Sequence, residues 1–295
     1  MSIRLIVTDM DGTLLDPNDR ISEENLRVLL ACQQQGIRVI LASGRSYLRL
    51  LPYLQQLQLE RYDGMLIESN GVALYAPKTK QQTVFEQLTL GESKTLCHLF
   101  RPYGTEIQIY FDNGVYYYIP EALMRRKEQE RKKRHLPEDY PWMGGPWSWV
   151  NDTRNGYPNQ KRILSFEEID QERINKINLT SDAETIASLE EEFHRVLPSA
   201  YTMVRTCPRM FEIAPRAISK GAALRHYMDQ EAIRSDEVIV FGDGENDVSM
   251  FNQVSYGIAM GNASEAVKRH AYAVTDTNAA DGVAAYLRKI IAFRE

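Results

Sequence analysis

The chain has 295 residues, of which 43% are hydrophobic and 25% are charged, and its formal net charge is -5. This composition is that of a soluble globular protein, the length suggests two domains, and the charge gives no electrostatic reason to expect nucleic acid as a partner. The three cysteines are widely separated and form no CxxC pair, so neither a disulfide framework nor a zinc site is expected: Cys32, Cys97 and Cys207.

The N-terminus and the apolar runs bear on where the chain resides. MSIRLIVTD passes from an apolar stretch directly into an acid and lacks the basic region of a signal peptide. No apolar run approaches the roughly 20 residues that a membrane-spanning helix needs. We therefore expect a cytoplasmic protein that does not bind membranes, and its oligomeric state is not indicated.

The first part of the chain predicts strands that alternate with helices. Residues 3–8 form a short apolar run typical of a buried parallel strand, and Ser22 is a good cap for the helix that follows. Further buried strands are expected over 37–42 and 64–67. This alternation is typical of a parallel α/β sheet.

The middle of the chain has longer, more alternating strands. Residues 107–111 and 115–119 flank an Asn-Gly turn, which predicts a hairpin. Strands over 174–179 and 201–204 flank an amphipathic helix. These features predict an α+β domain inserted into the α/β one.

The α/β alternation resumes near the C-terminus. A helix is expected to begin at Lys220, and strands are expected over 238–241, 256–260 and 272–275. A last helix is predicted over 284–291.

Two domains follow from these patterns. Residues 1–82 and 209–295 are expected to form a Rossmann-like parallel-sheet core, and 83–208 an inserted α+β domain. Linkers between them are expected near 77–83 and 206–209.

Four short segments with reactive side chains follow predicted strands or begin a predicted helix of the core. Ligands of open α/β sheets bind beyond the carboxyl ends of the strands, so these segments are expected to meet at one edge. The first segment holds Asp9 and Asp11. One of these acids can serve as a nucleophile and the other as a general acid and base. A simple acid pair at a strand-to-turn junction is an equal alternative.

The second and third segments suit a phosphate group. Ser43 and the backbone N–H groups after it can form a phosphate cradle, although Ser-Gly is also ordinary in loops. Lys220 lies at a helix start, where the helix dipole favours anions, so a phosphate or carboxylates should accompany it. A solvated surface lysine is the alternative.

The fourth segment is Gly-Asp-Gly-Glu-Asn-Asp at 242–247, after a predicted strand. Carboxylate and amide oxygens in a glycine-rich loop suit a hard cation such as Mg²⁺. The spacing and terminal glutamate of an EF-hand calcium loop are missing.

Together the four segments resemble a known family. Asp9-Met10-Asp11-Gly12-Thr13, Ser43, Lys220 and the loop 242–247 match, in order, the four motifs of the haloacid dehalogenase (HAD) superfamily. The insert resembles the C2-type cap of the Cof-type sugar-phosphate phosphatases. The resemblance covers nearly the whole chain, and it implies a phosphatase whose cap selects the substrate.

The resemblance also implies roles for the acidic residues. Asp9 would attack phosphorus and form an aspartyl phosphate, and Asp11 would act as general acid and base. Mg²⁺ would be held by Asp9, the backbone carbonyl of Asp11, and Asp243, with Asp247 supporting them. The second acid, Asp11, is what phosphatases and mutases of the superfamily have.

The phosphate-binding residues are carried over in the same way. Ser43, Lys220 and Asn246 would bind the transferring phosphoryl oxygens. Gly44 belongs to the cradle after the strand, and Arg45 lies close enough along the chain to reach a substrate oxygen.

Some features remain open at this level. The family usually has a glycine shortly before Ser-Lys-Gly, whereas this chain reads Ala-Pro-Arg-Ala-Ile at 214–218, so Arg216 could lie near the substrate. The segment 125–135 has seven basic residues and is either an anion-attracting helix or a solvated face. A cluster of tryptophans could stack on a substrate or anchor a loop: Trp142, Trp147 and Trp149.

The expected partner is a small phosphorylated metabolite, either a sugar phosphate or a phosphorylated cofactor such as pyridoxal phosphate or a flavin mononucleotide. A phosphomutase of the phosphomannomutase type is the nearest alternative, and dependence on a bisphosphorylated activator would distinguish it. A non-catalytic phosphate-binding protein is disfavoured, because Asp9, Asp11, Lys220 and Asp243 are all present.

Overall fold

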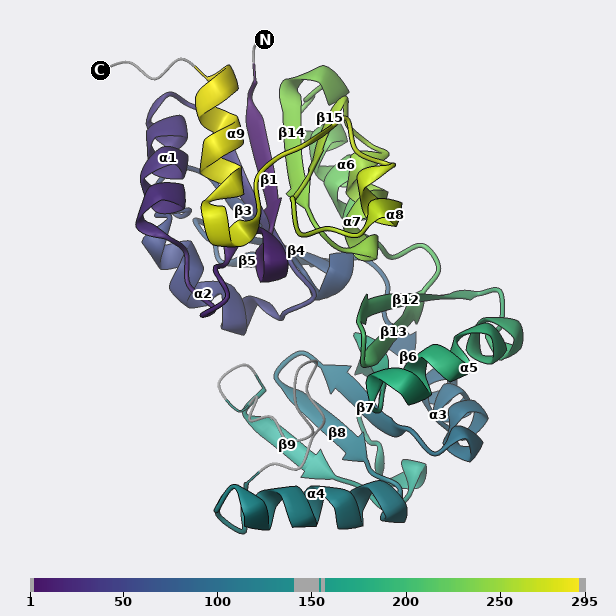
Figure 1. Cartoon of the computed structure of the whole chain (residues 1–295). Coiled ribbons are helices and arrows are strands. Elements are labelled where there is room, and N and C mark those ends of the chain that lie inside the picture. The colour runs from purple at the N-terminus through teal and green to yellow at the C-terminus, as the bar shows by residue number, and fades with distance from the viewer. Residues whose placement is uncertain (1–2, 141–153, 155–156, 292–295) are drawn as a thin grey trace. The chain divides into compact units, whose positions relative to one another are not determined.

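The computed structural model describes residues 3–140, 154 and 157–291. The chain divides into a core unit, Met1–Phe85 with Ile218–Glu295, and an inserted unit, Glu86–Ala217 (Figure 1). Each unit has its own sheet and its own hydrophobic core. The three tryptophans lie outside the described residues.

The core unit is built on one eight-stranded sheet. Its strands are β1 (Leu5–Asp9), β2 (Arg38–Ala42), β3 (Met65–Glu68), β4 (Ala73–Ala76), β5 (Gln81–Val84), β14 (Val238–Gly242), β15 (Tyr256–Ala259) and β16 (Ala273–Val274). Their order is β16-β15-β14-β1-β2-β3-β4-β5. The strands from β16 to β3 run parallel, and β4 and β5 add an antiparallel edge.

Helices cover both faces of this sheet (Figure 1). One face packs against α1 (Glu23–Gln34), α2 (Tyr47–Gln56) and α9 (Gly282–Ile290), and the other against α6 (Lys220–Gln230), α7 (Glu245–Phe251) and α8 (Glu265–Lys268). Successive residues of a strand point to opposite faces, so Ile6 enters one core while Leu5 and Val7 enter the other. This two-sided burial explains the continuous apolar runs and confirms the predicted α/β fold.

The inserted unit has a six-stranded sheet in the order β12-β13-β11-β7-β8-β9, and a separate β6–β10 pair. Its elements are β6 (Leu88–Thr89), α3 (Leu90–Phe100), β7 (Glu106–Phe111), β8 (Gly114–Tyr118), α4 (Glu121–Lys133), β9 (Asn159–Arg162), β10 (Arg173–Ile174), β11 (Lys176–Thr180), α5 (Ala183–Val196), β12 (Tyr201–Cys207) and β13 (Met210–Pro215). Phe100 of α3 and Phe193 of α5 pack with Ile109 and Ile177 of the sheet into its core.

The linkers expected near 77–83 and 206–209 were wrongly predicted. Residues 77–83 belong to the β4–β5 hairpin, and 206–209 to the β12–β13 hairpin, so each lies inside one unit. Polar turn residues produce the same signal in a hairpin as in a linker. The chain passes between the units at 85/86 and 217/218, since a boundary at 208/209 would separate two paired strands.

The basic segment 125–135 lies on α4 and just beyond it, and most of its basic side chains are exposed. Lys127 is the exception: it is fully buried and forms an ion pair with Glu106 of β7. Among the described residues, none of the helices combines the length and the apolar character needed to cross a bilayer.

Candidate active site

Four neighbouring parallel strands bring the predicted site residues to one edge of the core sheet. β14, β1, β2 and β3 lie side by side in that order. β1 ends at Asp9, Ser43 follows β2, Asn70 follows β3 and Asp243 follows β14. The carboxyl ends of parallel strands share one edge, so residues far apart in the sequence converge there.

Three carboxylates form a cluster around one lysine. Asp9, Asp243 and Asp247 each place an oxygen within 4.8 Å of the other two. Lys220, at the start of α6, is 1% exposed, and its Nζ donates to Oδ1 of Asp9 at 2.5 Å and to Oδ1 of Asp247 at 2.7 Å. The cluster therefore has more negative than positive charge when its acids are ionised.

Two carboxylates of the cluster, Asp9 and Asp243, have raised pKa values. Burial raises the pKa of Asp9 well above its usual value, the charges of Asp247 and Asp243 raise it further, and Lys220 only partly offsets them. Burial, and then the charge of Asp247, raises the pKa of Asp243 to about 7. Burial works against the charge of Lys220, but Asp247 and Asp9 outweigh it and raise that pKa as well. Hard oxygen ligands with uncompensated charge suit a divalent cation such as Mg²⁺.

The loop after β14 is held by its own acid and by the loop after β1. Oδ2 of Asp247 accepts hydrogen bonds from the backbone N–H of Asp243 at 3.0 Å and of Gly244 at 2.9 Å. Thr13 donates from Oγ1 to Oδ1 of Asp243 at 2.7 Å. Gly12 has φ 82°, and a Cβ there would lie 2.3 Å from Oδ2 of Asp243, so only glycine allows the two loops to approach.

Asp11 lies apart from the three-carboxylate cluster. Its side chain is 51% exposed and accepts from Nε of Arg45 at 2.9 Å on Oδ2, and from Nη2 of Arg45 on Oδ1. Burial opposes the charge of Arg45, but the hydrogen bonds and charges of Asp11 and Asp19 more than offset it and raise the pKa of Arg45. Arg45 thus contacts the predicted acid–base residue.

The remaining predicted residues gather around Asn70. Ser43 is 1% exposed, and its backbone N–H donates to the carbonyl of Ile67 at 2.8 Å. Asn246 donates from Nδ2 to Oδ1 of Asn70 at 3.0 Å. Gly44 lies against the same amide, since a Cβ on it would be 3.1 Å from Nδ2 of Asn70. Asn70 therefore links the loops after β2 and β14.

Three residues that contact the site were not predicted from the sequence: Asn262, Asp19 and Tyr53. Asn262 lies three residues beyond the end of β15 and donates from Nδ2 to the carbonyl of Gly12 at 2.8 Å. Its position after a parallel strand was a usable signal. Asp19 and Tyr53 contact Arg45, and no motif pointed to them. For Arg216, the sequence suggested a place near the substrate; its Nε donates to the carbonyl of Ser199 at 2.6 Å, within the inserted unit.

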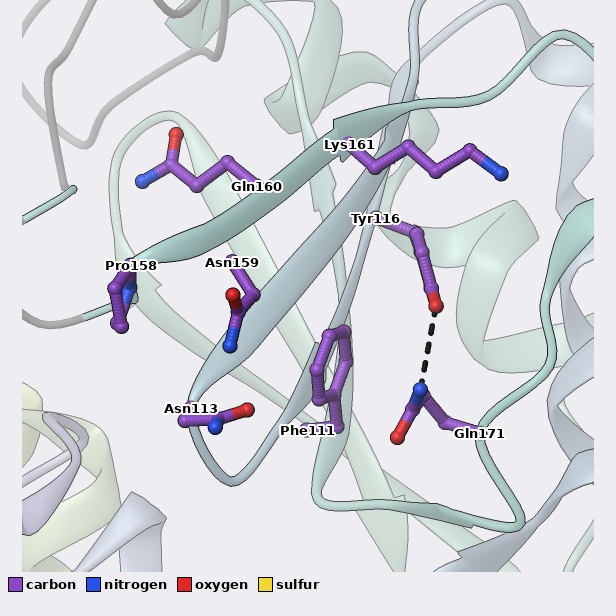
Figure 2. Close-up of a pocket in the computed structure, with 8 residues that line it drawn as sticks. All are labelled: Phe111, Asn113, Tyr116, Pro158, Asn159, Gln160, Lys161 and Gln171. Atoms are coloured by element: carbon purple, nitrogen blue, oxygen red, sulfur yellow. Dashed lines mark hydrogen bonds between the residues drawn. The ribbon is translucent and has the colours of Figure 1, made fainter.

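A separate hollow of about 430 Å³ lies in the inserted unit (Figure 2). Figure 2 shows Gln171 donating to the hydroxyl of Tyr116 across one side of it. The described residues that line it include one lysine and no carboxylate: Phe111, Asn113, Tyr116, Pro158, Asn159, Gln160, Lys161 and Gln171. None of the predicted site residues is among the described residues that line this hollow.

Known proteins match the chain over nearly its whole length. The sequence profile of the haloacid dehalogenase-like hydrolases matches residues 6–287. A phosphatase of Bacillus subtilis is 26% identical over 294 residues, covering 98% of this chain and 100% of that protein. A pyridoxal phosphate phosphatase of Escherichia coli is 25% identical over 287 residues, covering 97% and 98%.

Solved structures also match the chain over nearly its whole length. A crystal structure of a haloacid dehalogenase-like hydrolase from Bacteroides thetaiotaomicron matches with a TM-score of 0.75 and 27% identity, over 98% of this chain and 100% of that chain. The chain therefore belongs to the haloacid dehalogenase-like hydrolase family. Within that family it is a phosphatase, as the sequence resemblance predicted.

Proposed function

We propose that this phosphatase hydrolyses small phosphorylated metabolites with the help of Mg²⁺, through an aspartyl phosphate on Asp9. The observation that carries the proposal is the cluster of Asp9, Asp243 and Asp247 around Lys220 at the carboxyl edge of the sheet. A carboxylate nucleophile repels an anionic phosphate, so the site needs cationic charge beside Asp9. Lys220 supplies part of it.

In the first step a carboxylate oxygen of Asp9 forms a bond to phosphorus. The bond between phosphorus and the ester oxygen breaks, and the electron pair leaves with that oxygen. The proton of Asp11 passes to the leaving oxygen, which departs as an alcohol. Asp11 is accessible enough for this role, with half of its side chain exposed.

In the second step water attacks phosphorus and gives a proton to Asp11. The bond between phosphorus and Asp9 breaks, which releases inorganic phosphate and restores the carboxylate. Asp9, Asp243 and the backbone carbonyl of Asp11 would hold Mg²⁺, with Asp247 supporting the loop, and the bound cation would neutralise charge on the transferring group.

The phosphoryl oxygens are assigned to Ser43, Gly44, Lys220 and Asn246. The first two follow β2, Lys220 begins α6, and Asn246 lies in the first turn of α7. Hydroxyl, backbone and amide donors at helix starts favour an anion. Phosphoryl transfer depends mainly on such positioning and charge neutralisation.

Substrate choice is assigned to the inserted unit. The described site residues of the core unit serve the phosphoryl group and its cation, and they offer little to distinguish one alcohol from another. Sugar phosphates and phosphorylated cofactors are the proposed classes, and the Escherichia coli relative named for pyridoxal phosphate puts that ester among the first to test.

The test is phosphate release from a panel of phosphate esters, with and without Mg²⁺, by the native protein and Asp9→Asn. Native protein should release phosphate from several esters only with Mg²⁺, and Asp9→Asn should lose this activity. Asp63→Asn is the matched control, because Asp63 is an exposed acid of the same unit, paired with Lys78.

Other outcomes would overturn the proposal. Folded native protein that releases no phosphate, but transfers it between hydroxyls when a bisphosphorylated sugar is added, would be a mutase. Binding of phosphate esters without any turnover would indicate a phosphate-binding protein.

A further inference from the structure

Arg45 lies at the centre of a polar cluster that joins Asp11 of the first motif to two residues outside the motifs, Asp19 and Tyr53. Its Nε and Nη2 donate to the two carboxylate oxygens of Asp11, and Nη2 also donates to Oδ1 of Asp19 at 2.5 Å. Its Nη1 donates to the hydroxyl of Tyr53 at 3.3 Å. The Arg45 side chain is only 11% exposed, whereas those of Asp11 and Asp19 are 51% and 56% exposed.

Asp19 lies in a turn that hydrogen bonds hold in place. The carboxylate of Asp16 accepts from the backbone N–H groups of Asn18 and Arg20 at 2.8 and 3.0 Å. A bridge between Leu15 and Ile21 closes the base of the turn. Asp19 itself has φ 63°, a left-handed conformation that Asp and Asn tolerate better than most residues. The turn thus fixes the position from which Asp19 reaches Arg45.

Tyr53 forms hydrogen bonds with both Arg45 and Asp19. It lies on α2, is 8% exposed, and its hydroxyl donates to the backbone carbonyl of Asp19 at 3.0 Å. The same hydroxyl accepts from Arg45, and the guanidinium lies 5.8 Å from the ring centroid of Tyr53. One hydroxyl therefore holds both the arginine and the turn.

A half-exposed carboxyl such as that of Asp11 samples several side-chain rotamers unless a fixed partner holds it. Arg45 can be that partner because its planar fork matches a carboxylate and because it is itself anchored. We propose that Asp19 and Tyr53 are positioning residues, which hold Arg45 in place so that Arg45 orients the carboxyl of Asp11. This inference rests on the proposed function, since it concerns proton transfer from Asp11 to the leaving oxygen.

The test separates proton transfer from other effects by the choice of leaving group. An alkyl alcohol leaves slowly unless it is protonated, whereas p-nitrophenolate leaves readily without a proton. Single-turnover rates of ester cleavage are measured with Mg²⁺ for p-nitrophenyl phosphate and for the alkyl phosphate ester of the panel that the native protein cleaves fastest. Asp19→Asn keeps the size and the turn conformation of Asp19 and removes its charge. It should slow cleavage of the alkyl ester by about tenfold and that of the aryl ester by less than about twofold.

Tyr53→Phe removes one hydroxyl from α2 and should act in the same direction as Asp19→Asn. Asp63→Asn is the matched control: Asp63 is 57% exposed, has φ 53° and pairs with Lys78 at 2.8 Å. It should leave both rates unchanged. In an Arg45→Lys background, which keeps the charge but loses the fork, Asp19→Asn should have no further effect.

Three results would overturn the inference. These are equal slowing of both esters by Asp19→Asn and Tyr53→Phe, unchanged rates in both variants, or an Asp19→Asn effect of full size in the Arg45→Lys background. Failure of the native protein to cleave any ester of the panel would instead contradict the proposed function, so the two failures are distinguishable.

Discussion

At the scale of single residues, Lys220 decides the chemistry of the site. A lysine that is 1% exposed has to be paired, and its two partners are Asp9 and Asp247. Burial raises the pKa values of Asp9 and Asp243, and they stay raised because one ammonium cannot neutralise three carboxylates. Binding of a second cation would neutralise the remaining negative charge of the three carboxylates.

Asp243 makes this testable through pH. Its pKa is about 7 in the folded chain against a usual value of 3.8, so the folded state favours the protonated form. The stabilisation from this proton is complete below pH 3.8 and is lost as the pH rises through about 7. Metal-free protein should therefore lose thermal stability over that window, and Mg²⁺ should raise the unfolding temperature more above pH 7 than below it, because the proton competes for the same oxygens.

Thermal unfolding across pH, with and without Mg²⁺, measures both effects, and Asp243→Asn is the control in which this contribution is absent. A pH dependence in the native protein identical to that of Asp243→Asn would contradict the assignment of the effect to Asp243.

At this scale the sequence singles out candidate reactive residues, but it does not single out the side chains that contact Arg45. Asp9, Asp11, Ser43, Lys220 and Asp243 stand in motifs whose spacing is visible in one sequence. Asp19 and Tyr53 lie 34 residues apart and meet only because a turn and α2 approach Arg45. Contacts of that kind depend on tertiary packing, which no local pattern encodes.

At the scale of elements, the close approach of α6 and α7 positions Lys220. A Cβ on Gly221 would lie 2.0 Å from the backbone oxygen of Ser249, and the N–H of Gly221 donates to Oγ of Ser249 at 3.1 Å. The glycine of Ser-Lys-Gly is therefore required by helix packing. It sets the depth at which the neighbouring lysine enters the cluster.

Gly221→Ala should destabilise the protein by about 1–3 kcal/mol, since the helices must separate to admit the methyl group. Gly91→Ala is the control, because Gly91 lies in α3 with nothing within 4 Å of the added Cβ, and alanine should be neutral or stabilising there. Urea denaturation measures both. Equal stability of Gly221→Ala and native protein would show that α6 and α7 do not pack as closely as described.

The elements themselves were largely predictable. Buried parallel strands have continuous apolar runs, and Ser22 caps α1 as expected, accepting from the N–H of Asn25 at 3.0 Å. The hairpin of β7 and β8 also follows from its Asn-Gly turn. The hairpins at 77–83 and 206–209 were mistaken for linkers, because strand pairing, and not turn composition, distinguishes the two.

At the scale of the whole molecule, the chain has two units with separate cores, and the three clustered carboxylates proposed to hold Mg²⁺ all belong to the core unit: Asp9, Asp243 and Asp247. Ligand binding stabilises the part of a protein that forms the site. Mg²⁺ alone should slow amide hydrogen exchange in residues 9–13 and 242–247, and leave β7, β8 and β11 unchanged. Slower exchange in those three strands of the inserted unit would contradict a site confined to the core unit.

Covalent catalysis by Asp9 requires a phosphorylated form of that residue, and a search for this form tests it. Native protein with Mg²⁺ is mixed with p-nitrophenyl phosphate, quenched in acid within the first turnover, digested and mapped by mass spectrometry. A phosphoryl group on Asp9, absent from Asp9→Asn, is the predicted result. Phosphate release by native protein with no phosphorylated aspartate at any quench time, or with the group on another residue, would contradict it.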